Sequence, residues 1–440
     1  MRDLALVSFF FGVLPWVFRR PWLGVLLMAW LSYMNPHRLC YSYAFEFPFF
    51  KIAALVTIFA AIIGFRGGFP WTRETVLLIV FAAWITFTTF FAQNQFAWNS
   101  WDKVIKIQAT ILLTLLILKD RAQIYLLVWV VALSLAFYGV KGGIFTLVTG
   151  GSHHVLGPEL TFIEDNNAIA LALAMAIPFM RYLQLNSELR LIRIGVGVMI
   201  ALTGLAVIAT YSRGGFVALS IAGVHMILKS RRRVLFTVLA IVFASAFLSF
   251  MPEQWLDRMH TIERYEEDGS SLGRINAWRF AVNVAIAHPI TGGGFEAFTK
   301  DMFLRYAPNP ESHHDAHSIY FEMLAEQGFI GLALFLTLGL FSWWSAGWIK
   351  KATAGMPDMY WASDLASMSQ VGLVSYAIGG AFLGMAYFDL PYHIVSIIVL
   401  TKVIVKRELL ARENEQAAAG DAAVDGAGYP AFGSAAADAG

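Results

Sequence analysis

The sequence is poor in charged residues and nearly free of cysteine. Asp, Glu, Lys and Arg together make up 14% of its 440 residues, whereas typical soluble domains have about 25%. Hydrophobic residues make up 58%, and this excess indicates a protein whose surface faces lipid rather than water. The single cysteine, Cys40, excludes an intramolecular disulfide framework and a cysteine-rich metal site.

Two further features are missing. The formal net charge is only +2 and the basic residues are scattered in short clusters, so the chain lacks the basic stripe that a nucleic-acid partner would require. A cleavable signal is also missing, because Arg19 and Arg20 follow the first apolar run where a small-residue cleavage site is expected. We therefore expect no nucleic-acid partner and a first apolar run that is retained as a membrane anchor.

Apolar runs recur along most of the chain. A helix needs about 20 largely apolar residues to cross a bilayer. Thirteen segments approach that requirement, and because the first two and the last are short, the pattern also fits twelve. We predict an all-α integral membrane protein of 12–13 transmembrane helices, with one long loop that contains short helices. The candidate spans lie near 3–18, 21–34, 48–65, 74–92, 101–118, 122–148, 166–187, 194–211, 214–229, 233–250, 318–348, 366–388 and 391–405.

Lysine and arginine gather in every second loop. Short loops rich in these residues stay on the cytoplasmic side of a membrane. The alternate loops, among them the long loop 251–317, are therefore assigned to the opposite side. The basic set consists of Arg19-Arg20, Arg66 with Arg73, Lys119 with Arg121, Arg181 with Arg190 and Arg193, Lys229 with Arg231-Arg232-Arg233, Lys350-Lys351, and Lys406-Arg407.

These assignments divide the chain into four parts. Residues 1–250 hold the first ten predicted helices, 251–317 form the long loop, and 318–412 hold the last helices. Residues 413–440 are rich in Ala, Gly and Asp and nearly free of large aliphatic residues, so they cannot bury a core. We predict that they form a disordered cytoplasmic tail.

Polar stretches stand at the non-cytoplasmic ends of several predicted spans, where ionisable residues are costly and therefore functional candidates. The first, 211–215, reads Tyr-Ser-Arg-Gly-Gly. Its two glycines let the backbone approach closely and leave N–H groups open to an anion beside Arg213. The structural alternative is a snorkelling arginine in a tight turn.

The second stretch lies in the long loop, where acidic residues give way to Gly273-Arg274 and then to apolar residues at helical spacing. Ser270 or Ser271 is a suitable N-cap, which would place Arg274 in the first turn of a helix. A helix dipole disfavours a cation there, and a bound anion would offset that cost. The structural alternative is an ion pair between Arg274 and the neighbouring acids.

The third stretch begins at residue 312 with Ser-His-His-Asp-Ala-His. Apolar residues at helical spacing follow, so His317 is predicted near the start of a helix that enters the membrane. A helix N-terminus favours neutral imidazole, the form that a general base requires. His313, His317 and Asp315 also suggest a metal site, but no cysteine or second carboxylate cluster supports it. A solvated polar cap is the remaining alternative.

A fourth stretch, 157–168, precedes the seventh predicted span. Asp165 or Asn166 is a suitable cap for that helix, and capping alone would explain the stretch. Together, the four stretches place two arginines, a histidine and an Asp/Asn turn on one face of the membrane. Two guanidinium groups suit a pyrophosphate, and a neutral histidine suits deprotonation of an acceptor hydroxyl. A lipid-diphosphate donor would carry its head group at this level.

These residues resemble the O-antigen ligase family, membrane enzymes that join undecaprenyl-diphosphate-linked polysaccharide to an acceptor. The resemblance covers about residues 150–400, and its third motif is the most specific. The start of the chain, with Asn35-Pro36-His37-Arg38, is more similar to the branch called exosortase-associated O-glycosylation ligases. The motifs are Ser212-Arg213-Gly214-Gly215, Gly273-Arg274 with Trp278, and Ala316-His317-Ser318-Ile319-Tyr320 running into Glu326-Gln327-Gly328-Phe329-Ile330-Gly331-Leu332.

The resemblance implies a fold like that of the C-type glycosyltransferases and an inverting transfer that needs no cofactor and no metal. The donor would be an undecaprenyl-diphosphate-linked glycan, and the acceptor lipid A–core or a protein. The protein would lie in the bacterial inner membrane among its lipids, with a periplasmic active site and a cytoplasmic C-terminus. The implied site residues are Arg213 and Arg274 on the diphosphate, His317 as the base, and His313, His314, Asn166 and Tyr320 in substrate contact.

Other functions fit parts of the same pattern. His313 and His314 depart from the commoner motif and leave open which histidine is the base, although His317 alone has the context of a helix start. A polymerase of the same superfamily and a protein O-glycosylation ligase share the catalytic logic. A polysaccharide transporter would carry polar residues at mid-membrane depth. Here they cluster at the outer edge, which favours an outward-facing enzyme.

Overall fold

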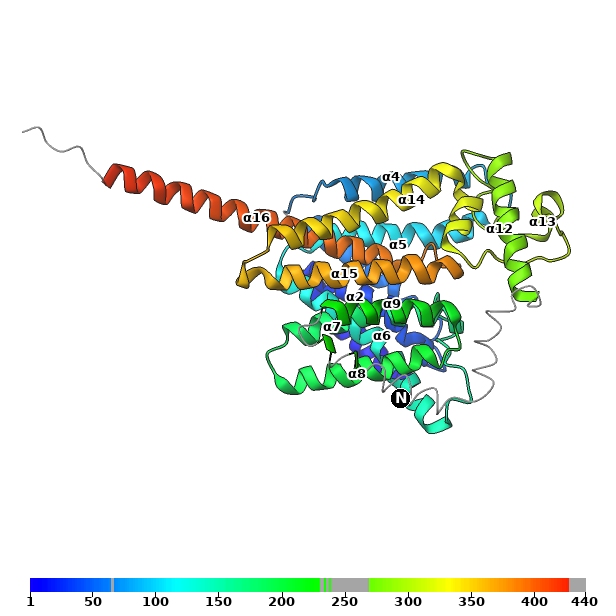
Figure 1. The fold of residues 1–440 in the computed structure, drawn as a ribbon, viewed down its shortest axis with the longest axis horizontal. Helices are drawn as coiled ribbons and strands as arrows, with labels where there is room; N and C mark the ends of the chain where they lie inside the picture. The colour runs from blue at the N-terminus through cyan, green and yellow to red at the C-terminus, as the bar shows by residue number, and fades with distance from the viewer. Residues whose placement is uncertain (65–66, 230–232, 235–236, 239–268, 427–440) are drawn as a thin grey trace, which may run out of the picture.

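A computed structural model describes residues 1–64, 67–229, 233–234, 237–238 and 269–426. These residues form helices and contain no strand, which confirms the predicted all-α fold (Figure 1). The predicted span 233–250 and the long loop as far as residue 268 lie largely outside the described residues.

The first helices are α1 (Arg2–Arg19), α2 (Pro21–Met34), η1 (Pro36–Leu39), α3 (Phe49–Gly64), α4 (Arg73–Thr89), α5 (Ala97–Ile117), α6 (Arg121–Thr149), α7 (Asn166–Asn186), α8 (Arg190–Ile208) and α9 (Arg213–Lys229). The later ones are α12 (Gly269–Ala287), α13 (Lys300–Tyr306), α14 (Ile319–Ala352), η2 (Pro357–Met359), α15 (Tyr360–Gly379), η3 (Gly380–Phe382) and α16 (Asp389–Gly426).

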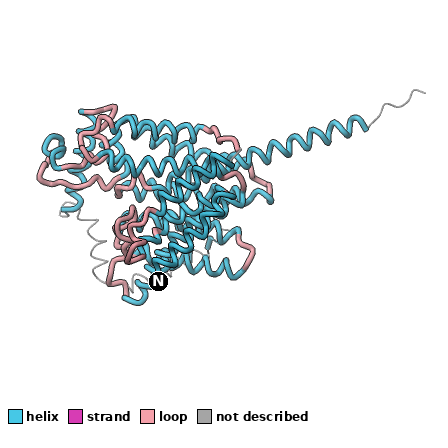
Figure 2. Tube along the Cα trace, turned by 180° about the vertical axis from the view of Figure 1, so that it is seen from behind, coloured by secondary structure: helices cyan, strands magenta, loops and turns pink. Residues whose placement is uncertain are grey.

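Most helices run along the long axis of the molecule, whereas α12 lies across one end of the bundle (Figures 1 and 2). The central helix is α7, which packs against α6, α8, α9 and α15. Every residue of α7 from Ala168 to Met180 is buried. A helix that is apolar around its whole circumference is buried on all sides, and small residues let its neighbours approach closely.

Within the described residues, five segments are long and apolar enough to cross a membrane, which confirms an integral membrane protein. Other predicted spans correspond to shorter helices. The 14 residues of α2, for example, extend about 21 Å, less than the hydrocarbon core of about 30 Å. The count of twelve or thirteen spans therefore stays a prediction. The five segments are Arg121–Thr149, Asn166–Asn186, Arg190–Ile208, Ile319–Ala352 and Pro357–Phe382.

A buried charged cluster ties three helices together in the half of the bundle away from α12. The carboxylate of Glu74, on α4, is fully buried. It accepts a hydrogen bond from Ser345 of α14 and lies 2.9 Å from Arg73 Nε and 3.6 Å from Lys402 Nζ of α16. A carboxylate out of water requires such partners, and losing one of them would leave an uncompensated charge.

The long helix α14 is broken at Gly328. Its φ of 68° and ψ of −172° form a backbone conformation that is essentially restricted to glycine. The turn 289–294 docks against the break, where the N–H of Phe329 donates to the Pro289 carbonyl oxygen at 3.0 Å. The break separates residues 319–327, which lie beside α12, from the longer apolar part of the helix.

The last helix, α16, continues to Gly426 and leaves the bundle as a single helix (Figure 1). The predicted disorder from residue 413 is therefore wrong for residues 413–426. The reason is that this alanine-rich segment has a high helix propensity, although its side chains from 413 to 419 are exposed and pack against nothing. Residues 427–440 lie outside the described part.

Candidate active site

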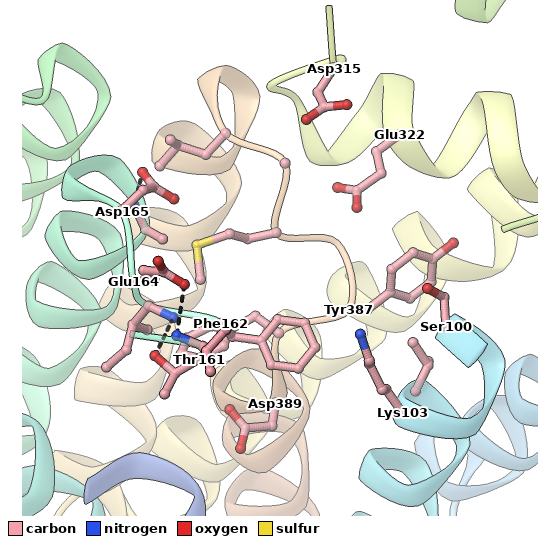
Figure 3. Close-up of a pocket in the computed structure, with 18 of the residues that line it drawn as sticks. Ser100, Lys103, Thr161, Phe162, Glu164, Asp165, Asp315, Glu322, Tyr387 and Asp389 are labelled. Atoms are coloured by element: carbon pink, nitrogen blue, oxygen red, sulfur yellow. Dashed lines mark hydrogen bonds between the residues drawn. The ribbon is translucent and has the colours of Figure 1, made fainter. Parts of the chain in front are cut away.

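A cavity of about 820 Å³ lies at the end of the bundle that carries α12 (Figure 3). Residues far apart in the sequence form its walls. The N-terminal half contributes α2, α5, α6 and the loop before α7, and the C-terminal half contributes the loops before α14 and α16 together with the start of α14. The cavity is thus a product of the whole chain rather than of one segment.

Of the seven site residues that the family resemblance implies, His317 alone lines this cavity. As predicted, it stands at the start of a long apolar helix, one residue before Ser318, the N-cap of α14. Burial, and after it the positive charge of Arg274, lower the pKa of the imidazole below its ordinary value. The ring is therefore neutral near pH 7 and can accept a proton.

Backbone strain is concentrated around the cavity. Five non-glycine residues of the described chain have a positive φ, and four of them line the cavity: Asn35, Leu160, Glu296 and His317. The φ of His317 is 42°. Such conformations cost about 1–3 kcal/mol each and persist where the surrounding structure enforces them, commonly at active sites. This concentration supports the cavity as the functional site.

Side chains of α12 hold the segment that carries His317. The indole N–H of Trp278 donates to the Ala316 carbonyl oxygen at 2.8 Å, and its ring stacks on Phe321 with the centroids 5.0 Å apart. Asn276 makes three hydrogen bonds to the backbone of the loop between α13 and α14. The Gly-Arg motif with its tryptophan therefore comes from the helix that positions the predicted base.

The two neighbouring histidines have different surroundings. His313 Nε2 lies 2.8 Å from the Phe298 carbonyl oxygen, and its ring packs edge-on against Phe303. His314 is exposed and lies against Gly273, where an added Cβ would be 2.9 Å from the imidazole. Neither histidine lines the cavity, which favours His317 among the three as the base.

Arg274 lies on α12, near enough to His317 for its charge to act on the imidazole, but it does not line the cavity. Ser270 and Ser271 lie inside α12, which is described from Gly269. The prediction that one of them caps the helix, with Arg274 in the first turn, is therefore wrong. Because the helix begins earlier than the polar pattern suggested, the dipole argument for an anion at Arg274 does not apply.

Arg213 is the first residue of α9. That helix contacts η3, which ends directly before the cavity residue Leu383. The second glycine of this motif has a packing role. A Cβ added to Gly215 would lie 2.4 Å from Cβ of Ala170 on α7, and the Gly215 N–H donates to Ser212 Oγ at 3.1 Å. That N–H is therefore occupied within the protein. Arg213 is outside the cavity lining, so its contact with a donor stays a prediction.

The remaining predicted residues hold the walls together. Asp165 caps α7, as expected, by accepting hydrogen bonds from two N–H groups of its first turn, and it lines the cavity. The Asn166 carboxamide donates to the Thr210 carbonyl oxygen at 2.8 Å, and the Tyr320 hydroxyl donates to the Ala377 carbonyl oxygen at 2.7 Å. Asn166 and Tyr320 therefore join helices behind the cavity surface.

Carboxylates are the main feature of the cavity that the predicted site residues do not include. Glu322 and Glu326 stand one helical turn apart in an otherwise apolar helix, and that placement was a signal in the sequence. Glu322 accepts a hydrogen bond from the Ala386 N–H at 3.1 Å, and Glu326 from the Glu296 N–H at 2.9 Å. The carboxylates that line the cavity are Glu164, Asp165, Glu296, Asp315, Glu322, Glu326 and Asp389 (Figure 3).

Two basic side chains, Arg38 and Lys103, also line the cavity. Both come from the N-terminal half and neither was predicted from the sequence. The acids are spread around the walls. Within the part of the chain that the structure describes, no group of three or more His, Cys, Asp or Glu side chains is placed to hold a metal ion.

Comparison with known families divides the chain in two. Residues 198–336 match the family described as O-antigen ligase, and residues 1–188 match a family of unknown function. No curated protein matches the chain. The cavity lies where the two matched regions meet, because His317 belongs to the first match and Arg38 and Lys103 to the second.

Proposed function

We propose that this chain is a membrane glycosyltransferase that moves a glycan from an undecaprenyl-diphosphate carrier to an acceptor hydroxyl, and the match of residues 198–336 to the O-antigen ligase family supports this. One observation carries the proposal: a half-buried histidine with a lowered pKa lies on the wall of an 820 Å³ cavity at one end of a membrane bundle. A lipid head group and an aqueous acceptor can both reach such a place. We assign this end to the periplasmic face of the bacterial inner membrane and the C-terminus to the cytoplasm.

In the proposed reaction the neutral imidazole of His317 takes the proton of the acceptor hydroxyl. The acceptor oxygen then forms a bond to the anomeric carbon from the side opposite the leaving group. The bond between that carbon and the diphosphate oxygen breaks, and its electron pair leaves with the diphosphate, so the configuration inverts. General-base catalysis of this kind typically contributes about 10²–10⁴-fold to the rate.

The donor diphosphate is assigned to Arg213 and Arg274. Guanidinium groups bind phosphate oxygens in a bidentate manner and would stabilise the charge that develops on the leaving group, without a nucleotide or a divalent metal. The closeness of Arg274 to His317 supports this assignment. Arg213 has weaker support, since only its helix approaches the cavity rim.

Three alternatives differ in the acceptor or in the chemistry. A polysaccharide polymerase and a protein O-glycosylation ligase would use the same base on another hydroxyl, and the geometry of the cavity does not separate them from a lipid A–core ligase. A non-enzymatic polysaccharide transporter would concentrate polar residues at mid-membrane depth. The carboxylates of this cavity gather at one end of the bundle, which favours an enzyme.

The proposal is tested by His317→Ala with His153→Ala as the matched control, because His153 is an exposed loop histidine outside the cavity. Purified protein is incubated with lipid-diphosphate-linked glycan and candidate acceptors in the presence of a chelator. We expect the wild type and His153→Ala to label an acceptor, and His317→Ala to lose about 10²-fold or more of the transfer rate. Undiminished transfer by a folded His317→Ala protein would sink the mechanism, and the acceptor that becomes labelled separates ligase from polymerase.

A further inference from the structure

Two basic side chains of the cavity come from the region that matches a family of unknown function. Arg38 lies in η1, directly after α2, and Lys103 lies in the second turn of α5. Both line the same cavity as His317. Figure 3 shows Lys103 projecting from α5 into the cavity beside Tyr387. Among the described residues of the lining, the lysine and the arginine therefore both come from the region that matches a family of unknown function.

Among the described residues, neither cation has a carboxylate partner, although Arg38 has an aromatic one. Across the described ranges, the side chains of Arg38 and Lys103 form no ion pair and no hydrogen bond, although seven carboxylates line the same cavity. Nε of Arg38 is buried without an acceptor, and the guanidinium carbon lies 4.6 Å from the centre of the Phe45 ring. A buried charged donor without an acceptor is costly, and an anionic ligand would remove that cost.

The carboxylates, by contrast, are engaged. Six of the seven accept a hydrogen bond: Glu164 and Asp165 from their own local turns, and the other four from a distant segment of the cavity wall. These contacts engage six of the seven carboxylates within the protein, whereas the two cations bond none of the seven. The acceptors and their donors are Glu164 with Leu160 N–H, Asp165 with Asn167 and Ala168 N–H, Glu296 with the Ser100 hydroxyl, Glu322 with Ala386 N–H, Glu326 with Glu296 N–H, and Asp389 with the Ser32 hydroxyl.

We propose that Arg38 and Lys103 form an anion-binding subsite that takes a phosphate or carboxylate group of a substrate held in the cavity. The proposal rests on the proposed function, because the substrate is a partner in the transfer at His317. Arg38 and the exposed Lys103 line the same cavity, and a guanidinium and an ammonium group each offer charge-assisted hydrogen bonds to an oxyanion. The oxyanion comes either from the donor diphosphate or from an anionic substituent of the acceptor. In both cases the N-terminal region contributes to substrate recognition.

The variants that test this subsite are Arg38→Gln and Lys103→Gln. Lys106→Gln is the control for the lysine, because Lys106 lies one turn further along α5, pairs with Asp102 and does not line the cavity. Arg279→Gln, an exposed arginine of α12 outside the cavity, is the control for the arginine. The charge-conserving variants Arg38→Lys and Lys103→Arg separate lost charge from lost packing, and thermal melting of each full-length protein in detergent identifies any variant that fails to fold.

The first readout is equilibrium binding of two probes by calorimetry. Inorganic pyrophosphate stands for the donor diphosphate, and glucose 6-phosphate, compared with glucose, stands for an anionic acceptor. We expect Arg38→Gln and Lys103→Gln each to weaken one probe at least tenfold, while the two controls and the charge-conserving variants stay within about threefold of the wild type. The probe that is weakened identifies the source of the anion. Unchanged binding of both probes, or tighter binding after a cation is removed, would overturn the subsite.

The second readout is the transfer assay. We expect the two Gln variants to raise KM for one substrate at least tenfold while kcat changes less than about threefold, because binding is lost and the base is intact. A raised donor KM and a raised acceptor KM again distinguish the two sources. If the wild type transfers no glycan, the proposed function fails while probe binding still tests the subsite. If the wild type transfers glycan and neither KM changes, the subsite alone fails.

Discussion

The imidazole of His317 is held in its neutral form by two physical effects of different origin. Burial removes the water that would solvate the protonated ring, and Arg274 adds a positive charge that repels it. The first effect belongs to the cavity as a whole. The second belongs to one side chain that does not line the cavity, so it is removed by mutation without enlarging the space around the base.

Replacing Arg274 by Gln therefore raises the pKa of His317 toward its ordinary value without reaching it, because burial remains. In the proposed mechanism the neutral ring is the active form, so activity is expected to be lost as the pH falls through this pKa. The acid limb of the pH profile of kcat/KM, which reports the free protein, is expected to lie below about pH 6.5 in the wild type and to move to higher pH in Arg274→Gln. The position of the limb is read independently of any loss in overall rate.

The control for this pH profile is Arg274→Lys, which keeps the positive charge and is expected to keep the acid limb near that of the wild type. An acid limb that stays in place when the charge is removed would contradict the electrostatic link between the two residues. Measuring both variants between about pH 4 and pH 8 covers the range in which a histidine of lowered pKa titrates.

At the scale of the helix, the break in α14 places its first two turns at the cavity. The turn 289–294 and Gly328 fit together so closely that a Cβ on Gly328 would lie 2.4 Å from the Ile290 carbonyl oxygen. Glu322 and Glu326 lie in the segment before the break and line the cavity. The glycine is therefore required both for its backbone conformation and for the space beside it.

Gly328→Ala is expected to lower the melting temperature of the detergent-solubilised protein by several degrees, because the strained φ alone costs about 1–3 kcal/mol. The control is Gly339→Ala in the same helix, where an added Cβ meets nothing within 4 Å. Alanine there is expected to leave the melting temperature unchanged or to raise it slightly. Equal melting temperatures for Gly328→Ala and the wild type would show that the docked turn does not depend on this glycine.

At the scale of the whole molecule, the bundle and the projecting end of α16 differ in how far their side chains are packed. Contacts reach α16 as far as Arg412, which bonds Asp358 and lies 3.9 Å from the Met356 sulfur. Beyond that residue, the side chains from 413 to 419 are all exposed. This part of the helix adds neither packing nor cavity wall.

Truncation after Arg412 is therefore expected to leave the melting temperature within about 2 °C of the full-length value and the transfer rate within about twofold, since surface changes away from packed features usually cost less than about 0.5 kcal/mol. A truncation after Val405 removes the Arg412 contacts as well and serves as the comparison that should lower stability. Loss of transfer after the truncation at Arg412 would show that the projecting part of α16 has a role in the reaction.

The sequence alone determined the features that depend on neighbouring residues. Hydrophobic excess and the length of the apolar runs are sufficient for an all-α membrane protein, because a bilayer requires every backbone group to be satisfied within a helix. The Asp165 cap and the position of His317 at the start of α14 also follow from patterns within a few residues. Helix propensity is also a local property, but the prediction of a disordered tail underestimated it after residue 412.

Only the tertiary structure decided the composition of the cavity, because its walls join residues that are distant in the chain. Ser100 and Glu296, which bond across the cavity rim, are 196 positions apart, and no local pattern links them. The same is true of Arg38 and Lys103, which the fold brings to the cavity of His317, and of Arg213, which it leaves outside the lining. Residue type and spacing predicted His317 as the base, whereas the packing of α2, α5 and α14 around one space selected the groups that surround it.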